Sequence, residues 1–233
     1  MSYPPTPLLG ADAQLRQSSI LGQVYAWMTA GLLVTSAVAA YAASAPVALN
    51  LIYGNPVTIW LLFLAQIGLV IGLSAAIDRL TPGAAVALFI AYAGLNGLTL
   101  SVIFLVYTYT SIAQAFLASA ATFGVMSLYG STTKRDLSTA GNLLVMALIG
   151  FLIGSIINLF WANSALYWVL TYLGIAVFIG LTAWDTQQIK RMSEQAHDDT
   201  TARRLAIFGA LKLYLDFINL FLLLLRVFGS SRE

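Results

Sequence analysis

The chain contains no cysteine, a single histidine and very little charge. Without cysteine it cannot form disulfides, thiolate metal sites or a cysteine nucleophile. Its histidine, His197, stands in a charged stretch next to Asp198 and Asp199, a setting more typical of a solvated residue than of a metal ligand. Charged residues make up only 9% of the 233 residues, against about a quarter in soluble domains, so an ordinary soluble fold is excluded.

Apolar residues take the place of the missing charge. They make up 60% of the chain, and the mean hydropathy is +0.86. Stretches of about bilayer length follow one another at residues 20–43, 57–77, 83–106, 112–130, 140–161, 166–189 and 207–228. The sequence therefore predicts an all-α polytopic membrane protein with seven transmembrane helices. We expect a mobile, proline-bearing N-terminal tail over residues 1–19 and a single membrane domain over residues 20–233.

The few basic residues are confined to the tail and to alternate connections. Arg16 lies in the tail, and the others lie after the second, fourth and sixth apolar stretches: Arg79, Lys134, Arg135, Lys190, Arg191, Arg203 and Arg204. The connections between them contain no charged residue. Because basic loops stay in the cytoplasm, we expect a cytoplasmic N-terminus and, with seven full crossings, an outer C-terminus. Arg226 and Arg232 keep open an alternative in which the last segment does not cross fully.

Three ionisable residues lie well inside the last two apolar stretches, away from the C-terminal Arg226: Asp185, Lys212 and Asp216. A charge inside a bilayer is costly and therefore marks a candidate functional site. Asp185 lies five residues, or about 7 to 8 Å of helix, before Lys190, and its short side chain cannot reach the interface as a lysine can. Since consecutive helices commonly lie side by side, the two carboxylates can meet, share a proton and titrate as a coupled pair. This predicts a proton sensor.

The depth of Asp216 depends on where the last helix begins. A start at Arg204 places Asp216 about 18 Å along the helix, whereas a start near Gly209 brings it to a depth similar to that of Asp185. A purely structural interpretation is also open. In it, Asp185 is an interfacial helix-end residue, and Asp216 pairs with Lys212, one turn earlier on the same face.

Two segments of these last stretches resemble the transmembrane Bax inhibitor motif family. They are the run from Gly180 to Lys190 and the run from Ala210 to Arg226, whose string Tyr-Leu-Asp-Phe-Ile-Asn-Leu-Phe (214–221) is the most specific part. The run from Val24 to Leu33 resembles the first helix of the bacterial branch of this family. The resemblance therefore extends over the whole chain.

The resemblance implies a seven-helix fold in which the other helices enclose the last one. It also implies a pH-sensitive leak of cations, chiefly Ca²⁺, across the bacterial inner membrane. The family's aspartate pair, which acts as pH sensor and candidate Ca²⁺ site, maps onto Asp185 and Asp216. A basic residue proposed to latch the pore shut maps onto Arg79. Lys212 departs from the family pattern, and a cation at that position would compete with Ca²⁺ for Asp216.

Other functions compete with this interpretation. A non-conducting regulator that binds membrane proteases or stress proteins is the first alternative. An intramembrane aspartyl protease also uses two membrane aspartates, but here Asp216 follows Lys212-Leu-Tyr-Leu and not the Gly-x-Gly of those enzymes. A rhodopsin-like retinal site at Lys212 lacks an acidic counterion in the third stretch.

The expected ligands and partners follow from the interpretation of the chain as a cation leak. We expect no enzymatic activity and no cofactor, with Ca²⁺ as the transported ion. The expected partners are the lipid bilayer, Ca²⁺, protons and other membrane proteins. The net charge is only +2 and the basic residues are thinly spread, which argues against binding to nucleic acid.

Overall fold

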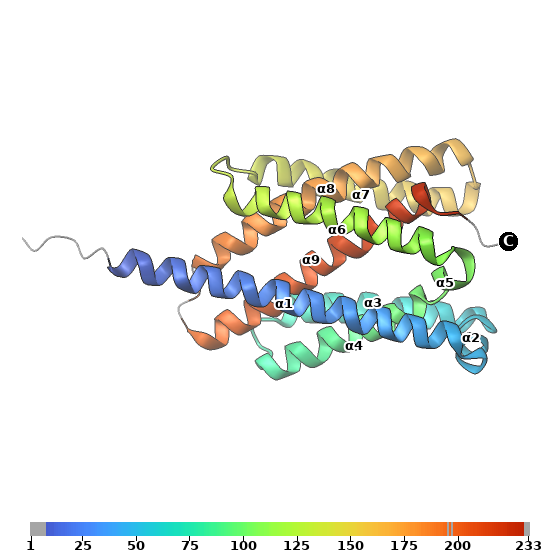
Figure 1. The fold of residues 1–233 in the computed structure, drawn as a ribbon, viewed down its shortest axis with the longest axis horizontal. Coiled ribbons are helices and arrows are strands. Elements are labelled where there is room, and N and C mark those ends of the chain that lie inside the picture. Colours follow the sequence, from blue (N-terminus) through green and yellow to red (C-terminus); the bar gives the residue numbers. More distant parts are fainter. Residues whose placement is uncertain (1–7, 195, 197, 231–233) are drawn as a thin grey trace, which may run out of the picture.

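The computed structural model describes residues 8–194, 196 and 198–230, with the backbone alone for residues 8–16. These residues form only helices, arranged as an elongated bundle (Figure 1). The helices are α1 (Leu8–Ser44), α2 (Pro46–Tyr53), α3 (Pro56–Ala76), α4 (Pro82–Leu100), α5 (Ile103–Val106), α6 (Tyr109–Thr132), α7 (Ser138–Trp161), α8 (Ser164–Glu194) and α9 (Asp199–Phe228). Seven segments are long and apolar enough to cross a membrane, α4 and α5 together forming one of them. The predicted all-α polytopic membrane fold is confirmed.

Prolines and short polar side chains fix where several helices begin. α3 and α4 each start with a proline, which is tolerated in a first turn because the missing amide hydrogen would have no partner there. Asn55 and Thr81, which precede these prolines, accept a hydrogen bond from a backbone amide of the first turn. Thr108 and Asp198 cap α6 and α9 in the same way. Hydrogen bonds from Thr201 hold the pKa of Asp198 below its usual value.

Two helices extend further than the apolar stretches indicated. α1 begins at Leu8, inside the expected tail of residues 1–19, because Pro7 is the last proline that opposes a helix. Residues 1–7 lie outside the described residues, and the mobility of the tail stays a prediction. The charged connection between the last two spans is largely helical, since α8 runs to Glu194 and α9 starts at Asp199. Charged residues suit helices that continue beyond the bilayer into water.

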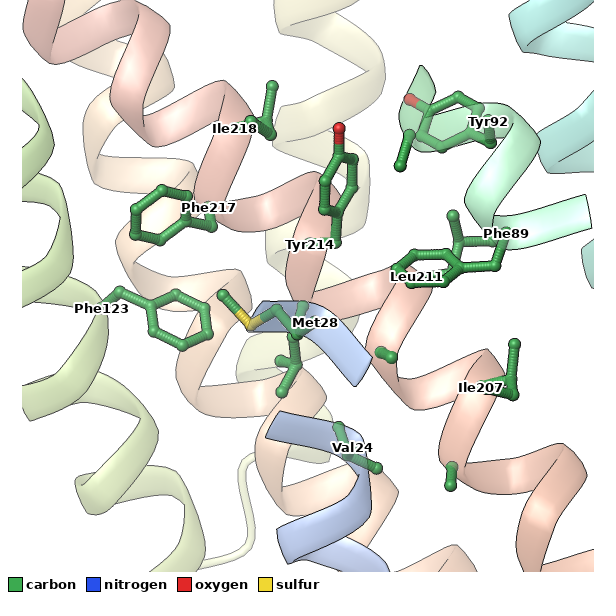
Figure 2. Packing of buried hydrophobic residues seen from close by; sticks show 14 of the residues in the cluster. Val24, Met28, Phe89, Tyr92, Phe123, Ile207, Leu211, Tyr214, Phe217 and Ile218 are labelled. Atoms are coloured by element: carbon green, nitrogen blue, oxygen red, sulfur yellow. The ribbon is translucent and has the colours of Figure 1, made fainter. Parts of the chain in front are cut away.

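α9 is the central helix of the bundle (Figure 1). It packs against α1, α4, α6 and α8, and sixteen of its 30 residues are buried. In the core shown in Figure 2, Phe217 contacts Phe123 of α6 edge to face, and Tyr214 contacts Phe89 of α4 in the same manner. α7, by contrast, buries only two of its 24 residues. The prediction that the other helices enclose the last one is confirmed.

Glycines let α6 and α7 approach α8 closely. A Cβ atom on Gly130 would collide with the carbonyl oxygen of Ala183, and one on Gly141 would collide with the ring of Trp184. Any larger residue at either position would therefore push its helix away from α8. The contact at Gly141 also fixes the ring of Trp184 beside the next residue along the chain, Asp185.

The charged connections gather at one end of the bundle. In Figure 1 the α3–α4, α6–α7 and α8–α9 connections lie at the end where α1 starts, and the α7–α8 turn lies at the opposite end. α9 crosses the whole bundle, because the backbone amide of Thr108, at the uncharged end, donates to the carbonyl oxygen of Ser230 at 3.2 Å. This position of α9 favours a last segment that crosses fully over the alternative in which it does not.

Candidate functional site

Lys212 of α9 forms an ion pair with Asp185 of α8. Its Nζ atom lies 2.8 Å from Oδ1 of Asp185 and donates a second hydrogen bond, of 2.6 Å, to Oε1 of Gln188. The Asp185 side chain is 8% exposed and that of Lys212 is 25% exposed, so the pair is largely removed from water. Lys212 forms no ion pair with Asp216 in the described residues, because helical side chains point back toward the helix N-terminus and carry the ammonium away from Asp216.

Among the described residues, the carboxyl group of Asp216 has no ion-pair or hydrogen-bond partner. The residue is 4% exposed, and its Oδ2 atom is buried with no hydrogen-bond partner among the described residues. It lines the same cavity as Asp185 and Lys212. The structure thus brings the two predicted aspartates to one cavity, but Lys212 holds Asp185, and no hydrogen bond joins the two carboxyl groups in the described part of the chain.

The cavity has a volume of about 630 Å³ and lies between α3 and α7, with α8 and α9 behind it. α3 packs on α2 and α4, and α7 packs on α8, so the two helices frame a lateral opening. Phe63, Ile71 and Leu152 line the cavity and are themselves 53%, 61% and 51% exposed, on a surface that faces lipid in a membrane. The lining is mostly apolar and includes the amides of Gln66 and Asn219.

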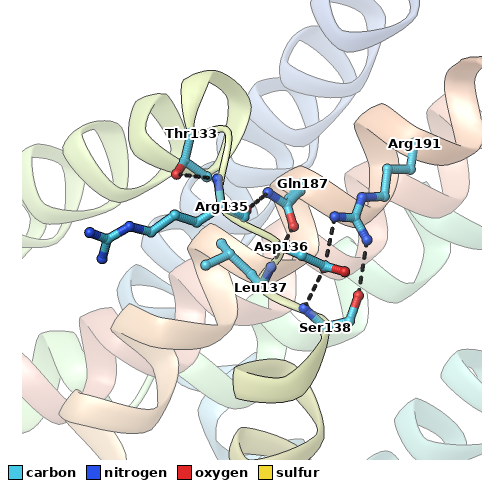
Figure 3. A network of polar contacts seen from close by, with 7 residues as sticks. All are labelled: Thr133, Arg135, Asp136, Leu137, Ser138, Gln187 and Arg191. Atoms are coloured by element: carbon cyan, nitrogen blue, oxygen red, sulfur yellow. Dashed lines mark hydrogen bonds and ion pairs between the residues drawn. The ribbon is translucent and has the colours of Figure 1, made fainter.

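The two carboxylates lie at different depths. Gln187 of α8 is fixed at the α6–α7 turn, where it donates to the carbonyl oxygen of Arg135 at 2.8 Å and accepts from the amide of Leu137 at 2.9 Å (Figure 3). Asp185 is two residues, or about 3 Å of helix, from this turn.

Asp216 lies much further from the charged end. Arg204 of α9 donates to the carbonyl oxygen of Asp78 at the α3–α4 turn at 2.8 Å, and Asp216 follows twelve residues, or about 18 Å of helix, later. Of the two depths that the sequence left open, the structure has the deeper one. Lys212 spans the difference because its long side chain extends back toward Asp185.

Two hollows approach the ion pair from the charged end. One, of about 300 Å³, is lined by Trp184, Gln188 and Arg191 among others. The second, of about 420 Å³, reaches Phe208, whose ring centroid is 5.9 Å from the Lys212 ammonium. Toward the uncharged end, α7, α8 and α9 close on a cluster with only apolar buried members, among them leucines of α9 beyond Asp216. The two hollows thus lie on the side of the ion pair toward the charged end, and the apolar cluster lies on the side toward the uncharged end.

The remaining predicted residues do not join this site. Arg79 is exposed in the α3–α4 turn and forms no ion pair with either aspartate in the described residues, so its role as a latch stays a prediction. His197 lies outside the described residues. Within the described part of the chain no three His, Asp or Glu side chains gather, and two carboxylates fall short of the six to eight oxygens of a tight Ca²⁺ site. Calcium binding by Asp185 and Asp216 stays a prediction.

Sequence reasoning missed a second buried polar site, on the opposite face of α9. The hydroxyl of Tyr214 lies 2.7 Å from Oγ1 of Thr35 in α1 and accepts a 2.7 Å hydrogen bond from the amide of Asn96 in α4. Tyr214 is fully buried. The available indication was the presence of Thr35 and Asn96 within apolar stretches, whereas the prediction considered only ionisable residues.

Comparisons with known proteins agree with this fold. A family model described as "Inhibitor of apoptosis-promoting Bax1" matches residues 17–233. The chain belongs to the Bax inhibitor family. "Inner membrane protein YbhL" of Escherichia coli K12 is 53% identical over 214 residues, which cover 91% of this chain and 92% of the relative.

More distant relatives match over a similar length. A Borreliella burgdorferi protein is 43% identical over 221 residues, 94% of this chain and 95% of its own. "Uncharacterized protein RP147" of Rickettsia prowazekii is 41% identical over 211 residues, 91% of this chain and 89% of its own. The resemblance found in the sequence is confirmed, and it covers the helices that carry Asp185 and Asp216.

Proposed function

We propose that this protein is a pH-sensitive cation leak of the bacterial inner membrane, with Ca²⁺ as the favoured ion. The observation that carries the proposal is the charged cavity lined by Asp185, Lys212 and Asp216. With both carboxylates ionised, Lys212 cancels the charge of Asp185, and Asp216 leaves the cavity with one net negative charge. Such a charge attracts a cation into a region that otherwise excludes it.

Proton binding provides the gate in this proposal. Protonation of either carboxyl group removes the net negative charge of the cavity, and loss of the charge on Asp185 also frees Lys212. Tyr92 is the other titratable group of the cavity lining, and the described residues of α3 and α7 contribute none. Because Asp185 and Asp216 act on one cavity, their titrations are coupled. Conduction then depends on pH, and the apolar cluster toward the uncharged end is the barrier that must open.

The ion pair argues against an intramembrane aspartyl protease. That chemistry needs two carboxyl groups that share one proton and hold a water molecule between them. Here Oδ1 of Asp185 is bonded to the Lys212 ammonium, which opposes proton sharing with Asp216. We therefore expect no protease activity.

The proposal includes the orientation of the chain. Because the Lys and Arg residues of the connections gather at one end, we place that end and the N-terminus in the cytoplasm. The chain has no native cysteine, so single cysteines report position directly. An impermeant thiol reagent added to intact spheroplasts should label Ser164→Cys, at the uncharged end, and spare Ser138→Cys. The reverse labelling pattern would contradict the orientation.

Calcium flux into liposomes that contain the purified protein tests the function. The expected result is a Ca²⁺ influx that varies with pH and is absent from protein-free liposomes. Asp199→Asn, which removes an exposed carboxylate at the start of α9, is the matched control and should leave the flux unchanged. Absence of Ca²⁺ flux at every pH would overturn the leak and favour the non-conducting regulator that binds other membrane proteins.

A further inference from the structure

The cavity beside Asp216 has features that the passage of an ion does not require. Its volume of about 630 Å³ lies within the range of small-molecule sites, about 300 to 1,000 Å³. Apart from Gln66, its walls on α3 and α7 are apolar, including Phe63, Val70 and Leu148, whereas a path for a hydrated ion is favoured by polar walls. The lateral opening between α3 and α7 gives a molecule dissolved in the bilayer direct access.

Asp216 determines which chemistry this cavity can bind. Its carboxyl group belongs to the cavity lining, its Oδ2 atom has no hydrogen-bond partner among the described residues, and Lys212 is bonded to Asp185 and Gln188 instead. A buried carboxylate oxygen needs a donor, and a cationic donor satisfies both its hydrogen bond and its charge. Phosphates and carboxylates are repelled by the same group. A metal ion that stays in the cavity finds too few oxygens there for tight binding.

We propose that this cavity binds a hydrophobic amine that enters from the bilayer, with its ammonium group on Asp216 and its apolar body between α3 and α7. Asn219 and Gln66 belong to the same lining, and the amide nitrogen of each donates to a backbone carbonyl. Their side-chain oxygens are therefore the groups that remain for further ammonium hydrogens. Both ends of an amphipathic amine thus find a matching surface.

The depth of the site selects a free amine over a lipid headgroup. Asp216 lies about 18 Å of helix beyond Arg204, which is fixed at the α3–α4 turn by its bond to Asp78. The amine of a phospholipid headgroup stays at the membrane interface and does not reach this depth. The site requires no ion conduction and stands independently of the proposed leak.

Binding of a fluorescent amine tests this proposal on the full chain. The probe is 9-(aminomethyl)anthracene, and its uncharged counterpart of the same shape is 9-(hydroxymethyl)anthracene. Energy transfer from tryptophan to anthracene measures binding to protein in phosphatidylcholine nanodiscs, because Trp184 lines the cavity. Empty nanodiscs correct for partition into lipid. The variants are Asp216→Asn, Asp216→Glu and, as matched control on the same helix, Asp199→Asn.

The expected result is saturable binding of the amine to wild type, with the alcohol about tenfold weaker or more, as for loss of a charge-assisted hydrogen bond. Asp216→Asn should reduce amine affinity to that of the alcohol, and Asp216→Glu and Asp199→Asn should retain it. Equal affinity for amine and alcohol, or amine affinity unchanged by Asp216→Asn, would overturn the proposal. If Asp216→Asn does not fold, the ratio of amine affinity to alcohol affinity on the wild-type protein decides whether the proposal stands. No ion gradient is present, so this outcome is separate from the flux result.

Discussion

Tyr214 and Asp216 lie two residues apart on the central helix and face opposite sides of it. The hydroxyl of Tyr214 is bonded to Thr35 and Asn96, whereas Oδ2 of Asp216 is buried and has no partner among the described residues. A satisfied buried polar group joins helices, here α1, α4 and α9, and stabilises their packing. An unsatisfied one costs free energy of folding, and its presence indicates a functional role. The same helix therefore carries a structural site on one face and a candidate functional site on the other.

The largest effect on stability is expected where a buried charge loses its partner. Lys212→Ser leaves Asp185, 8% exposed in its side chain, as an uncompensated charge, and breaking such a pair costs about 3 to 5 kcal/mol. Thermal unfolding in detergent should show this loss. The double variant Lys212→Ser with Asp185→Asn should recover most of it, since no charge is then stranded. Equal stability of the single and double variants would mean that the ion pair contributes nothing.

A smaller loss is expected on the Tyr214 face. Tyr214→Phe removes one hydroxyl and leaves the buried amide of Asn96 without its acceptor, at a cost of about 1 to 3 kcal/mol of unfolding free energy. The same thermal unfolding assay measures this, with Tyr41→Phe as control, because Tyr41 is 73% exposed. If Tyr214→Phe is as stable as the control, the hydrogen bonds of Tyr214 do not join these helices.

Asp216→Asn should change stability least among the buried substitutions, by under about 1 kcal/mol or in the stabilising direction. The reason is that the carboxylate oxygen has no hydrogen bond to lose and its buried charge disappears. Thermal unfolding in detergent shows whether the substitution lowers or raises the stability. A loss as large as that of Lys212→Ser would reveal a structural role for Asp216 and remove the contrast with Tyr214.

The fold was largely predictable from the sequence, whereas the pairing of charges was not. The lengths of the apolar stretches predict the seven crossings, and the basic residues predict which connections share an end. Periodicity does not distinguish the central α9 from the peripheral α7, since both are strongly apolar, and the enclosure of α9 was expected from family resemblance. The partner of Lys212 depends on side-chain direction and on the relative depth of two helices, neither of which a sequence contains.

The smallest effect is expected at an exposed polar group outside the membrane spans. The Ser138 amide donates to Asp136, and with the hydroxyl of Ser138 and the Arg191 guanidinium it lowers the pKa of that carboxyl from 3.8 to about 2 (Figure 3). Because the folded pKa lies below the unfolded one, the stabilisation is complete above about pH 4 and is lost as the pH falls through about 2. Asp136→Asn should flatten the dependence of stability on pH in this acid range alone. Unfolding experiments at a series of pH values within this range check the prediction.

The central claim is that Asp216, and not the neighbouring polar group on the other face of α9, makes the cavity responsive to protons and cations. The most direct test is Ca²⁺ flux into liposomes measured across a pH series for Asp216→Asn and Tyr214→Phe in parallel. We predict that Tyr214→Phe keeps the wild-type pH profile and that Asp216→Asn loses or simplifies it, since only one titrating carboxylate remains in the cavity. An unchanged profile in folded Asp216→Asn would contradict the account.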